Sequence, residues 1–302
     1  MINLRYHIVS LVAVFLALGL GILVGTTVID QGLVHDLRRR TDGFAKNLDD
    51  ARATNDALSR QQALWEAFGR DAFARFGHGK LSKRSIVFVV QDGTSPGMLD
   101  GIVQSLGDAG AVIEGRVNLT GKWELKSDEA RQQLALALGS SASSSEDLIT
   151  EAAGRLAGRL GQSRNPAGGP DLLVKLRDAG FLSFESTVES FPSSSSLTVV
   201  VPSGVKDAKP PQSQFFMPFL VALAPARKTA IVEPLSAAES LVDRVRGSSD
   251  LRDQISTVDD GDIALGRFAL VYALRSLVVT NTSSHYGARR SAAKLVPDLF
   301  AA

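Results

Sequence analysis

The sequence predicts an α/β fold class, with an N-terminal transmembrane helix and a coiled-coil stalk followed by a mainly parallel, doubly wound sheet with a helical insertion. Three observations predict it: a long uncharged run near the N-terminus, a proline-free stretch with heptad spacing, and short β-branched runs alternating with helix-like segments. The expected parts are a short cytoplasmic end (1–7), a transmembrane helix (8–29), a helical stalk (30–76), an α/β domain (83–286) with the insertion at about 126–180, and a C-terminal tail (287–302).

The uncharged run at residues 8–29 reads IVSLVAVFLALGLGILVGTTVI. A helix of this length spans about 33 Å, which matches a hydrocarbon core about 30 Å thick. The run is longer than the apolar part of a cleaved signal peptide and lacks a convincing small-x-small cleavage site. It therefore predicts an uncleaved, single-pass membrane anchor.

Small residues recur every four positions along this predicted helix, at Ala13, Ala17, Gly21 and Gly25. Such a stripe lets two membrane helices approach closely, so it predicts a helix-packing interface. The alternative is that glycine and alanine are simply frequent in membrane helices. The count of basic residues, with Arg5 before the run and residues 38–40 after it, would place the large domain in the cytoplasm, and charge alone does not settle the orientation.

A heptad pattern runs through the stalk without a break. Its a and d positions alternate by four and three residues: Val34, Leu37, Thr41, Phe44, Leu48, Ala51, Asn55, Leu58, Gln62 and Trp65. This spacing predicts the seam of a parallel two-stranded coiled coil, and hence a homodimer or higher homo-oligomer, with a polar a position that fixes register. The alternative is an amphipathic helix packed on its own domain, because Gly43 weakens the helix and the flanking positions lack clear complementary charges.

Short apolar runs rich in β-branched residues mark the strands of the large domain. We expect strands at residues 85–90, 111–117, 197–201, 229–233 and 255–258. Helices are expected at residues 98–109, 213–223, 237–246 and 263–277, with a further helix from Ser145 in the insertion. This alternation is typical of a parallel sheet with helices on both faces.

Four aspartates follow predicted strands, with Asp92 after the first strand and Asp259, Asp260 and Asp262 after the last. Ligands of open parallel sheets bind beyond the carboxyl ends of the strands, so these carboxylates are candidate ligands of a hard metal cation. The favoured alternative is that they cap helices and shape turns, since Asp262 directly precedes a predicted helix.

Composition argues against several other functions. The chain has no cysteine, which excludes disulfides, thiolate metal sites and cysteine nucleophiles, and its net charge of +1 does not favour nucleic-acid binding. It contains no glycine-rich phosphate loop, its four histidines are far apart, and no nucleophile-and-base set is recognisable. The sequence therefore predicts a non-enzyme with no evident cofactor.

The opening residues 1–25, the stretch ISTVDD at residues 255–260 and the pair Gly266 and Arg267 resemble the actinobacterial copper-transport protein B family over nearly the whole chain. The resemblance implies a channel-forming envelope protein linked to copper efflux and homeostasis. It also implies that the large domain is extracytoplasmic, with outer-membrane placement as a further possibility, and that an envelope membrane protein is a partner in cell separation. Copper is implied by the resemblance only, since soft Cu(I) prefers Cys and Met and the chain has three Met.

Two functions therefore stay open at the level of sequence. One is copper transport across the envelope. The other is a dimeric, non-enzymatic scaffold that presents a partner-binding domain. The short apolar strands separated by helices suit a water-soluble sheet and not a transmembrane barrel.

Overall fold

A computed structural model describes residues 4–142, 144–162, 170–186 and 191–298. The chain divides into two compact units, residues 1–64 and residues 65–302. The first unit consists of most of helix α1 (Leu4–Phe76), which continues without interruption into the second. For residues 26–34 only the helical backbone is described.

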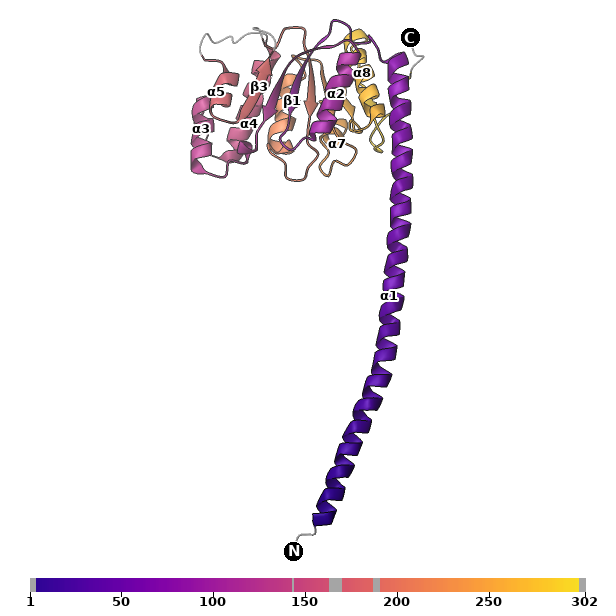
Figure 1. Cartoon of the computed structure of the whole chain (residues 1–302). Coiled ribbons are helices and arrows are strands. Elements are labelled where there is room, and N and C mark those ends of the chain that lie inside the picture. The colour runs from indigo at the N-terminus through magenta and orange to yellow at the C-terminus, as the bar shows by residue number, and fades with distance from the viewer. Residues whose placement is uncertain (1–3, 143, 163–169, 187–190, 299–302) are drawn as a thin grey trace. The chain divides into compact units, whose positions relative to one another are not determined.

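The second unit is built on a seven-stranded sheet with the order β3-β2-β1-β4-β5-β6-β7 (Figure 1). The strands are β1 (Ser85–Val90), β2 (Val112–Leu119), β3 (Leu182–Ser186), β4 (Leu197–Val201), β5 (Thr229–Val232), β6 (Ile255–Val258) and β7 (His285–Tyr286). All neighbouring pairs are parallel except β2 with β3, which is antiparallel. The predicted α/β class and the mostly parallel sheet are confirmed.

Each face of the sheet has its own apolar core. In β1, Ile86, Phe88 and Val90 belong to one core, and Val87 and Val89 belong to the other. The first core is closed by α2 (Pro96–Asp108) and α8 (Ala264–Val279). A strand buried on both faces needs an unbroken apolar run, which is why the central strands could be predicted from composition.

The second core is closed by helices from the insertion and from the C-terminal half. These are α3 (Asp128–Leu138), α4 (Ser145–Gly161), α5 (Leu172–Asp178), the π-helix η2 (Gln212–Phe216), α6 (Met217–Leu223) and α7 (Leu241–Arg246). Trp123, in the short 3₁₀ helix η1 (Gly121–Glu124), is fully buried in this core, and its ring nitrogen donates to the Phe181 carbonyl at 2.7 Å. Side chains of Ser127, Ser144 and Asp171 cap the three insertion helices.

Two edge strands were not predicted from the sequence. β3 reads LSFES and has only one fully buried residue, and β7 is two residues long. Residues after β7 fold back on it, since Gly287 N–H donates to the Lys294 carbonyl at 3.1 Å and Ala293 N–H to the His285 carbonyl at 3.0 Å. Edge strands pair on one side only and need no continuous apolar run, so their sequence signal is weak.

The last turns of α1 pack on α8 within the second unit. Gly69 is buried, and a Cβ at this position would lie 2.4 Å from the Cβ of Ala264. Glu66 accepts a hydrogen bond from Ala264 N–H at 3.1 Å and pairs with Arg267 at 3.0 Å. Glu66 thus caps the first turn of α8, whose own N-cap Ile263 has no side chain able to do so.

Two glycines of α1 give a matched test of this packing. We expect Gly69→Ala to reduce thermal stability, because overpacking costs about 1–3 kcal/mol and outweighs a gain in helix propensity of roughly 1 kcal/mol. We expect Gly43→Ala, whose Cβ would meet nothing within 4 Å, to be neutral or stabilising. Thermal unfolding of both full-length variants, together with tryptic cleavage after Arg75, measures this. Equal behaviour of the two variants would show that α1 does not dock on α8.

Candidate functional site

The structure brings together three of the four predicted aspartates. Asp259, Asp260 and Asp262 follow β6, whereas the exposed Asp92 follows β1. Strands β4 and β5 lie between β1 and β6, which separates the two strands by about 14 Å at the usual interstrand spacing. Within the described residues, no group of three or more His, Cys, Asp or Glu side chains is placed to hold a metal ion.

Asp259 is engaged by an internal ion pair. Its carboxylate is fully buried and lies 2.5 Å from the guanidinium of Arg246, which is only 3% exposed. The other carboxylate oxygen accepts hydrogen bonds from the backbone N–H groups of Ala288 at 2.8 Å and Arg289 at 3.1 Å. Arg246 also donates to Thr257 at 2.8 Å and to the Tyr286 carbonyl at 2.7 Å. This pair therefore ties α7, β6 and β7 together.

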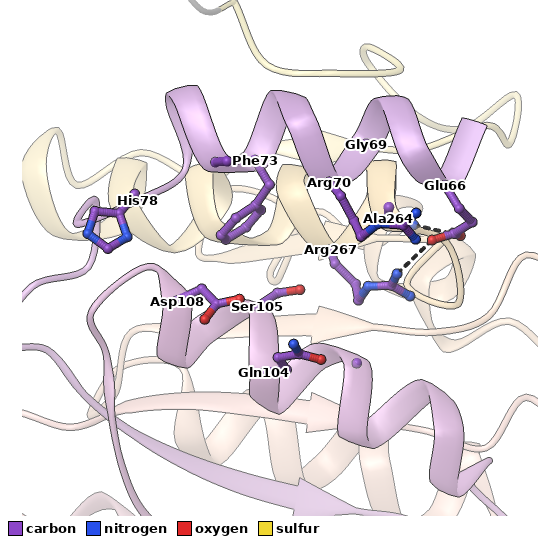
Figure 2. A pocket seen from close by; sticks show the side chains of 12 residues that line it. Glu66, Gly69, Arg70, Phe73, His78, Gln104, Ser105, Asp108, Ala264 and Arg267 are labelled. Carbon is purple, nitrogen blue, oxygen red and sulfur yellow. Dashed lines mark hydrogen bonds and ion pairs between the residues drawn. The ribbon is translucent and has the colours of Figure 1, made fainter. Parts of the chain in front are cut away.

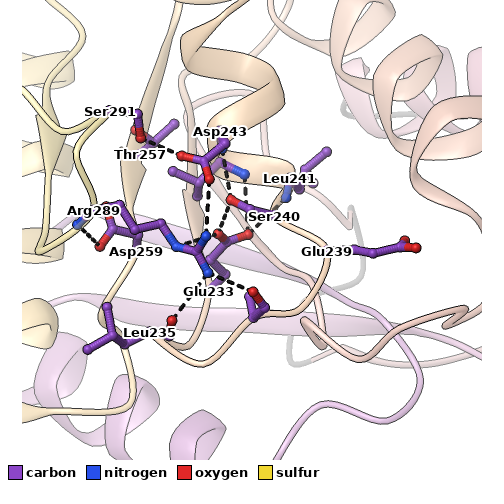
Figure 3. Close-up of polar contacts among 12 residues, drawn as sticks. Glu233, Leu235, Glu239, Ser240, Leu241, Asp243, Thr257, Asp259, Arg289 and Ser291 are labelled. Atoms are coloured by element: carbon purple, nitrogen blue, oxygen red, sulfur yellow. Dashed lines mark hydrogen bonds and ion pairs between the residues drawn. The ribbon is translucent and has the colours of Figure 1, made fainter.

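A second set of charges lies next to this pair (Figure 3). The buried Glu233 accepts hydrogen bonds from the Ser240 hydroxyl and, at 3.0 Å, from Leu241 N–H at the start of α7. Arg289 reaches Asp243 at 3.1 Å and lies 3.8 Å from Glu233. Burial raises the pKa of Glu233 to about 7, against the opposing effect of these hydrogen bonds and of Arg289.

Asp260 differs from its neighbour. It is fully buried, and neither of its carboxylate oxygens has a hydrogen-bond partner among the described residues. Burial raises the pKa of Asp260 to about 7, with a further contribution from the charges of Asp259 and Asp262. Gly266 packs against it so closely that a Cβ there would lie 1.9 Å from the Asp260 carbonyl oxygen, so only glycine fits.

The remaining candidates for copper ligation are scattered. His285 is the one histidine of the α/β domain that lies beside these charges, and both of its ring nitrogens are occupied, Nδ1 at 2.8 Å from Thr257 Oγ1 and Nε2 at 3.0 Å from the Arg252 carbonyl. Burial and the nearby Arg246 lower its pKa, which favours the neutral ring. Met98 is buried in the first core. The geometry is that of a structural charge network and not of a soft-metal centre.

The sheet order changes direction between β1 and β4, where hydrogen bonds of Gln91 connect the following loops. The buried Gln91 donates to the Pro210 carbonyl at 2.9 Å and accepts from Ser203 N–H at 2.9 Å. Ligands of open α/β sheets usually bind in this crevice. Here the amide side chain of Gln91 joins the segments that follow β1 and β4.

A groove of about 480 Å³ lies where the end of α1 meets α2 and α8 (Figure 2). The Glu66–Arg267 ion pair is at one end and His78 is at the other. Its lining mixes charged and apolar residues: Glu66, Gly69, Arg70, Phe73, Ala74, His78, Gly101, Gln104, Ser105, Asp108, Ala264 and Arg267. It is the helix-packing boundary of the first core and not an extension of the sheet-end network.

Helix α1 supplies, within its described side chains, one segment that is long and apolar enough to cross a membrane, Arg5–Gly25. This segment overlaps the predicted span 8–29. Gly21 and Gly25 have open space around them in a single chain. The packing interface of small residues predicted at Ala13, Ala17, Gly21 and Gly25 stays a prediction, since it needs a second helix.

The apolar seam residues of α1 are exposed in the single chain. Leu37, Phe44, Leu48, Leu58 and Trp65 are between 51% and 74% exposed, and Ala51 and Asn55 are exposed as well. The side chain of Val34 lies outside the described residues. The coiled-coil seam therefore also stays a prediction.

The described residues combine one helix long and apolar enough to cross a membrane with an α/β unit built on a mostly parallel sheet. The family model described as "Copper transport outer membrane protein, MctB" matches residues 1–297, and the chain belongs to this family. This confirms the resemblance found in the sequence.

Curated relatives agree with the family model. The copper transporter MctB of Mycobacterium tuberculosis (strain ATCC 25618 / H37Rv) is 27% identical over 304 residues, which cover 95% of this chain and 96% of the relative. The copper transporter MctB of Mycobacterium leprae (strain TN) is 25% identical over 316 residues, which cover 98% of this chain and 99% of the relative.

Sequence reasoning singled out Asp259 and Arg267 but missed their partners. Arg246, Arg289 and Glu66 are far from them in sequence and lie in ordinary polar surroundings. One signal was available for Arg246, since it follows Val245 and Val242 on the buried side of α7. A charge on the apolar side of a helix requires a buried partner.

Proposed function

We propose that the chain is a membrane-anchored envelope protein that takes part in copper transport and homeostasis. The observation that carries this proposal is the family match over residues 1–297, together with relatives named as copper transporters that align over nearly their whole length. Arg5–Gly25 supplies a segment suited to the anchor. The role is non-enzymatic, in keeping with a family described as transport proteins.

Copper is the cargo in this proposal. The part of the chain that the structure describes holds no group of three or more His, Cys, Asp or Glu side chains placed to bind a metal ion. Transient contact with single carboxylates or histidines, or with a partner protein, is the route that the residues support.

Cell copper content tests the proposal. We expect cells that lack this chain to accumulate several times more copper than the parent during growth in copper, because export is impaired. The full-length chain restores the parental level, and a variant without residues 1–29 does not. Mass spectrometry of washed cells measures the copper, with zinc content as the control. Unchanged copper in the deletion strain would contradict the proposed function.

The finer arrangement we propose is a single-pass topology with the α/β domain, a doubly wound sheet, on the extracytoplasmic side. Because the sequence contains no cysteine, a single introduced cysteine provides the one thiol that a maleimide can label. A Ser236→Cys variant carries its thiol at an exposed position of the α/β domain. We expect a membrane-impermeant maleimide to label it in intact cells. Labelling only after lysis would place the domain in the cytoplasm.

We also propose that the chain forms a parallel homodimer through the exposed heptad seam of α1. Supporting this, the apolar seam side chains Leu37, Phe44, Leu48, Leu58 and Trp65 are exposed in the single chain. A long polar helix gains most of its stability from burying an apolar stripe. Both copies enter a membrane from the same end, so a parallel pairing is the arrangement available to them.

A further inference from the structure

His78 and Asp108 line the end of the groove that lies away from the Glu66–Arg267 ion pair (Figure 2). His78 belongs to the turn that follows α1, and Asp108 is the last residue of α2. Both residues are exposed, and within the described part of the chain neither side chain makes a hydrogen bond or an ion pair. The two residues therefore offer an imidazole and a carboxylate to the same end of the groove.

Backbone contacts hold the turn of His78 against the end of α2. Gly79 has a φ of +72°, a conformation that glycine adopts easily and that turns the chain back after His78. Leu81 N–H then donates at 2.8 Å to the carbonyl of Ala109, the residue that follows Asp108. Leu81 and Ala109 are also both buried in the first core. The turn that carries the imidazole is thus fixed to the helix end that carries the carboxylate.

The charge of Asp108 is unfavourable for the helix that carries it. The last turn of α2 contains this acid and no basic residue. Because the carboxyl end of a helix carries partial negative charge, a carboxylate there is destabilising and a bound cation is stabilising. Ser105, one turn earlier on α2, lines the same groove and adds a hydroxyl oxygen. Of the two arginines that line the groove, Arg267 is paired with Glu66, and Figure 2 shows Arg70 on the side of that pair. The end of the groove at Asp108 therefore favours a cation.

We propose that His78 and Asp108 form a contact site for Cu²⁺, the oxidised form of the copper cargo. This inference rests on the proposed function and names a place on the chain where the cargo binds. Nitrogen and oxygen ligands together suit Cu²⁺, which binds such ligands more tightly than the other divalent first-row metals do. Two protein ligands are fewer than a resident metal centre uses, in agreement with the lack of a larger ligand group in the described residues. Such a pair suits an ion that is bound and then released.

Titration of the purified full-length chain in detergent, with Cu²⁺ alone as the probe, tests the imidazole. We expect His78→Ala to weaken Cu²⁺ binding roughly tenfold or more, and to remove the imidazole nitrogen signal of the bound ion from the electron paramagnetic resonance spectrum. His35→Ala is the control, because it removes an exposed histidine that does not line the groove. We expect this control to bind Cu²⁺ as the unmodified chain does.

Two aspartates of α2 give a matched test of the carboxylate. Asp108 lines the groove, whereas Asp100 is exposed on the same helix and does not. We expect Asp108→Asn to weaken Cu²⁺ binding about tenfold. Its metal-free midpoint of thermal unfolding is expected to stay the same or to rise, because the variant removes an acid from the end of the helix. Asp100→Asn is expected to bind Cu²⁺ as the unmodified chain does.

The double variant decides whether the two residues bind the same ion. We expect His78→Ala combined with Asp108→Asn to bind Cu²⁺ about as weakly as His78→Ala alone, since ligands of one ion act as a unit and their losses do not add. Losses that add, or equal binding by all of the variants, would overturn the site. Either result would leave the proposed function to the copper content of cells. Unchanged copper in the deletion strain would overturn that function even if His78 and Asp108 bind Cu²⁺.

Discussion

An Asp259→Ala variant is expected to lose about 3–5 kcal/mol of unfolding free energy, because its removal leaves a buried guanidinium without compensating charge. The side chain of Arg246 is only 3% exposed, so water does not replace the lost carboxylate. The variant also leaves the N–H groups of Ala288 and Arg289 without their acceptor, so the segment that follows β7 loses these two hydrogen bonds. For a unit of this size the midpoint of thermal unfolding would fall by roughly 6–20 °C.

Asp253→Ala is the matched control for this loss. Asp253 also faces an arginine, Arg252, at 3.7 Å, but its side chain is 84% exposed. Exposed pairs contribute little, so we expect the control to unfold as the unmodified chain does. Thermal and urea unfolding of both variants measure the difference. Equal stability of the two variants would show that the Arg246–Asp259 pair does not hold this end of the sheet.

Replacing the adjacent aspartate, Asp260, is expected to raise the unfolding free energy, whereas replacing Asp259 lowers it. Burial raises the pKa of Asp260 to about 7 from an ordinary value of 3.8. Between these values the folded chain holds a proton that the unfolded chain has lost. The unfolding free energy therefore falls as pH rises from about 4 to about 7, and stays low above that. The full shift corresponds to about 4 kcal/mol at 1.36 kcal/mol per unit, an upper bound.

An Asp260→Asn variant removes this penalty. We expect it to be more stable than the unmodified chain at pH 8, by up to about 3–4 kcal/mol, with the difference vanishing near pH 4. Because Glu233 titrates in the same range, the comparison between the two chains, and not the pH profile of either one, isolates Asp260. Asp253→Asn serves as the exposed control. A variant that is destabilised equally at both pH values would show that Asp260 is ionised and paired in the folded chain.

The central strands could be predicted from the sequence because burial on both faces demands an unbroken apolar run. β1, β4 and β6 have the predicted bounds to the residue. β3 and β7 could not be predicted, since each lies at an edge of the sheet and is not buried as a continuous apolar run. Their position depends on long-range contacts that no local pattern records.

The candidate site, like the sheet, has some features that the sequence predicts and others that it does not. Asp259, Asp260 and Asp262 meet because they are neighbours in sequence, and Asp92 is separate because strand order is a property of the topology. The ion pair of Asp259 with Arg246 crosses from a strand to a helix, so spacing along the chain does not reveal it. Gly266 and Arg267, which support the family resemblance, both have structural roles. Gly266 lacks the Cβ that would clash with the Asp260 carbonyl oxygen, and Arg267 forms an ion pair with Glu66.

We propose that this chain takes part in moving copper out across the cell envelope. The most direct measurement is the rate at which cells preloaded with radioactive copper release it, in the parent, in a strain lacking the chain and in the complemented strain. We expect release to slow several-fold in the deletion strain and to recover with the full-length chain, while release of preloaded zinc stays the same. Identical copper release in all three strains would contradict the account.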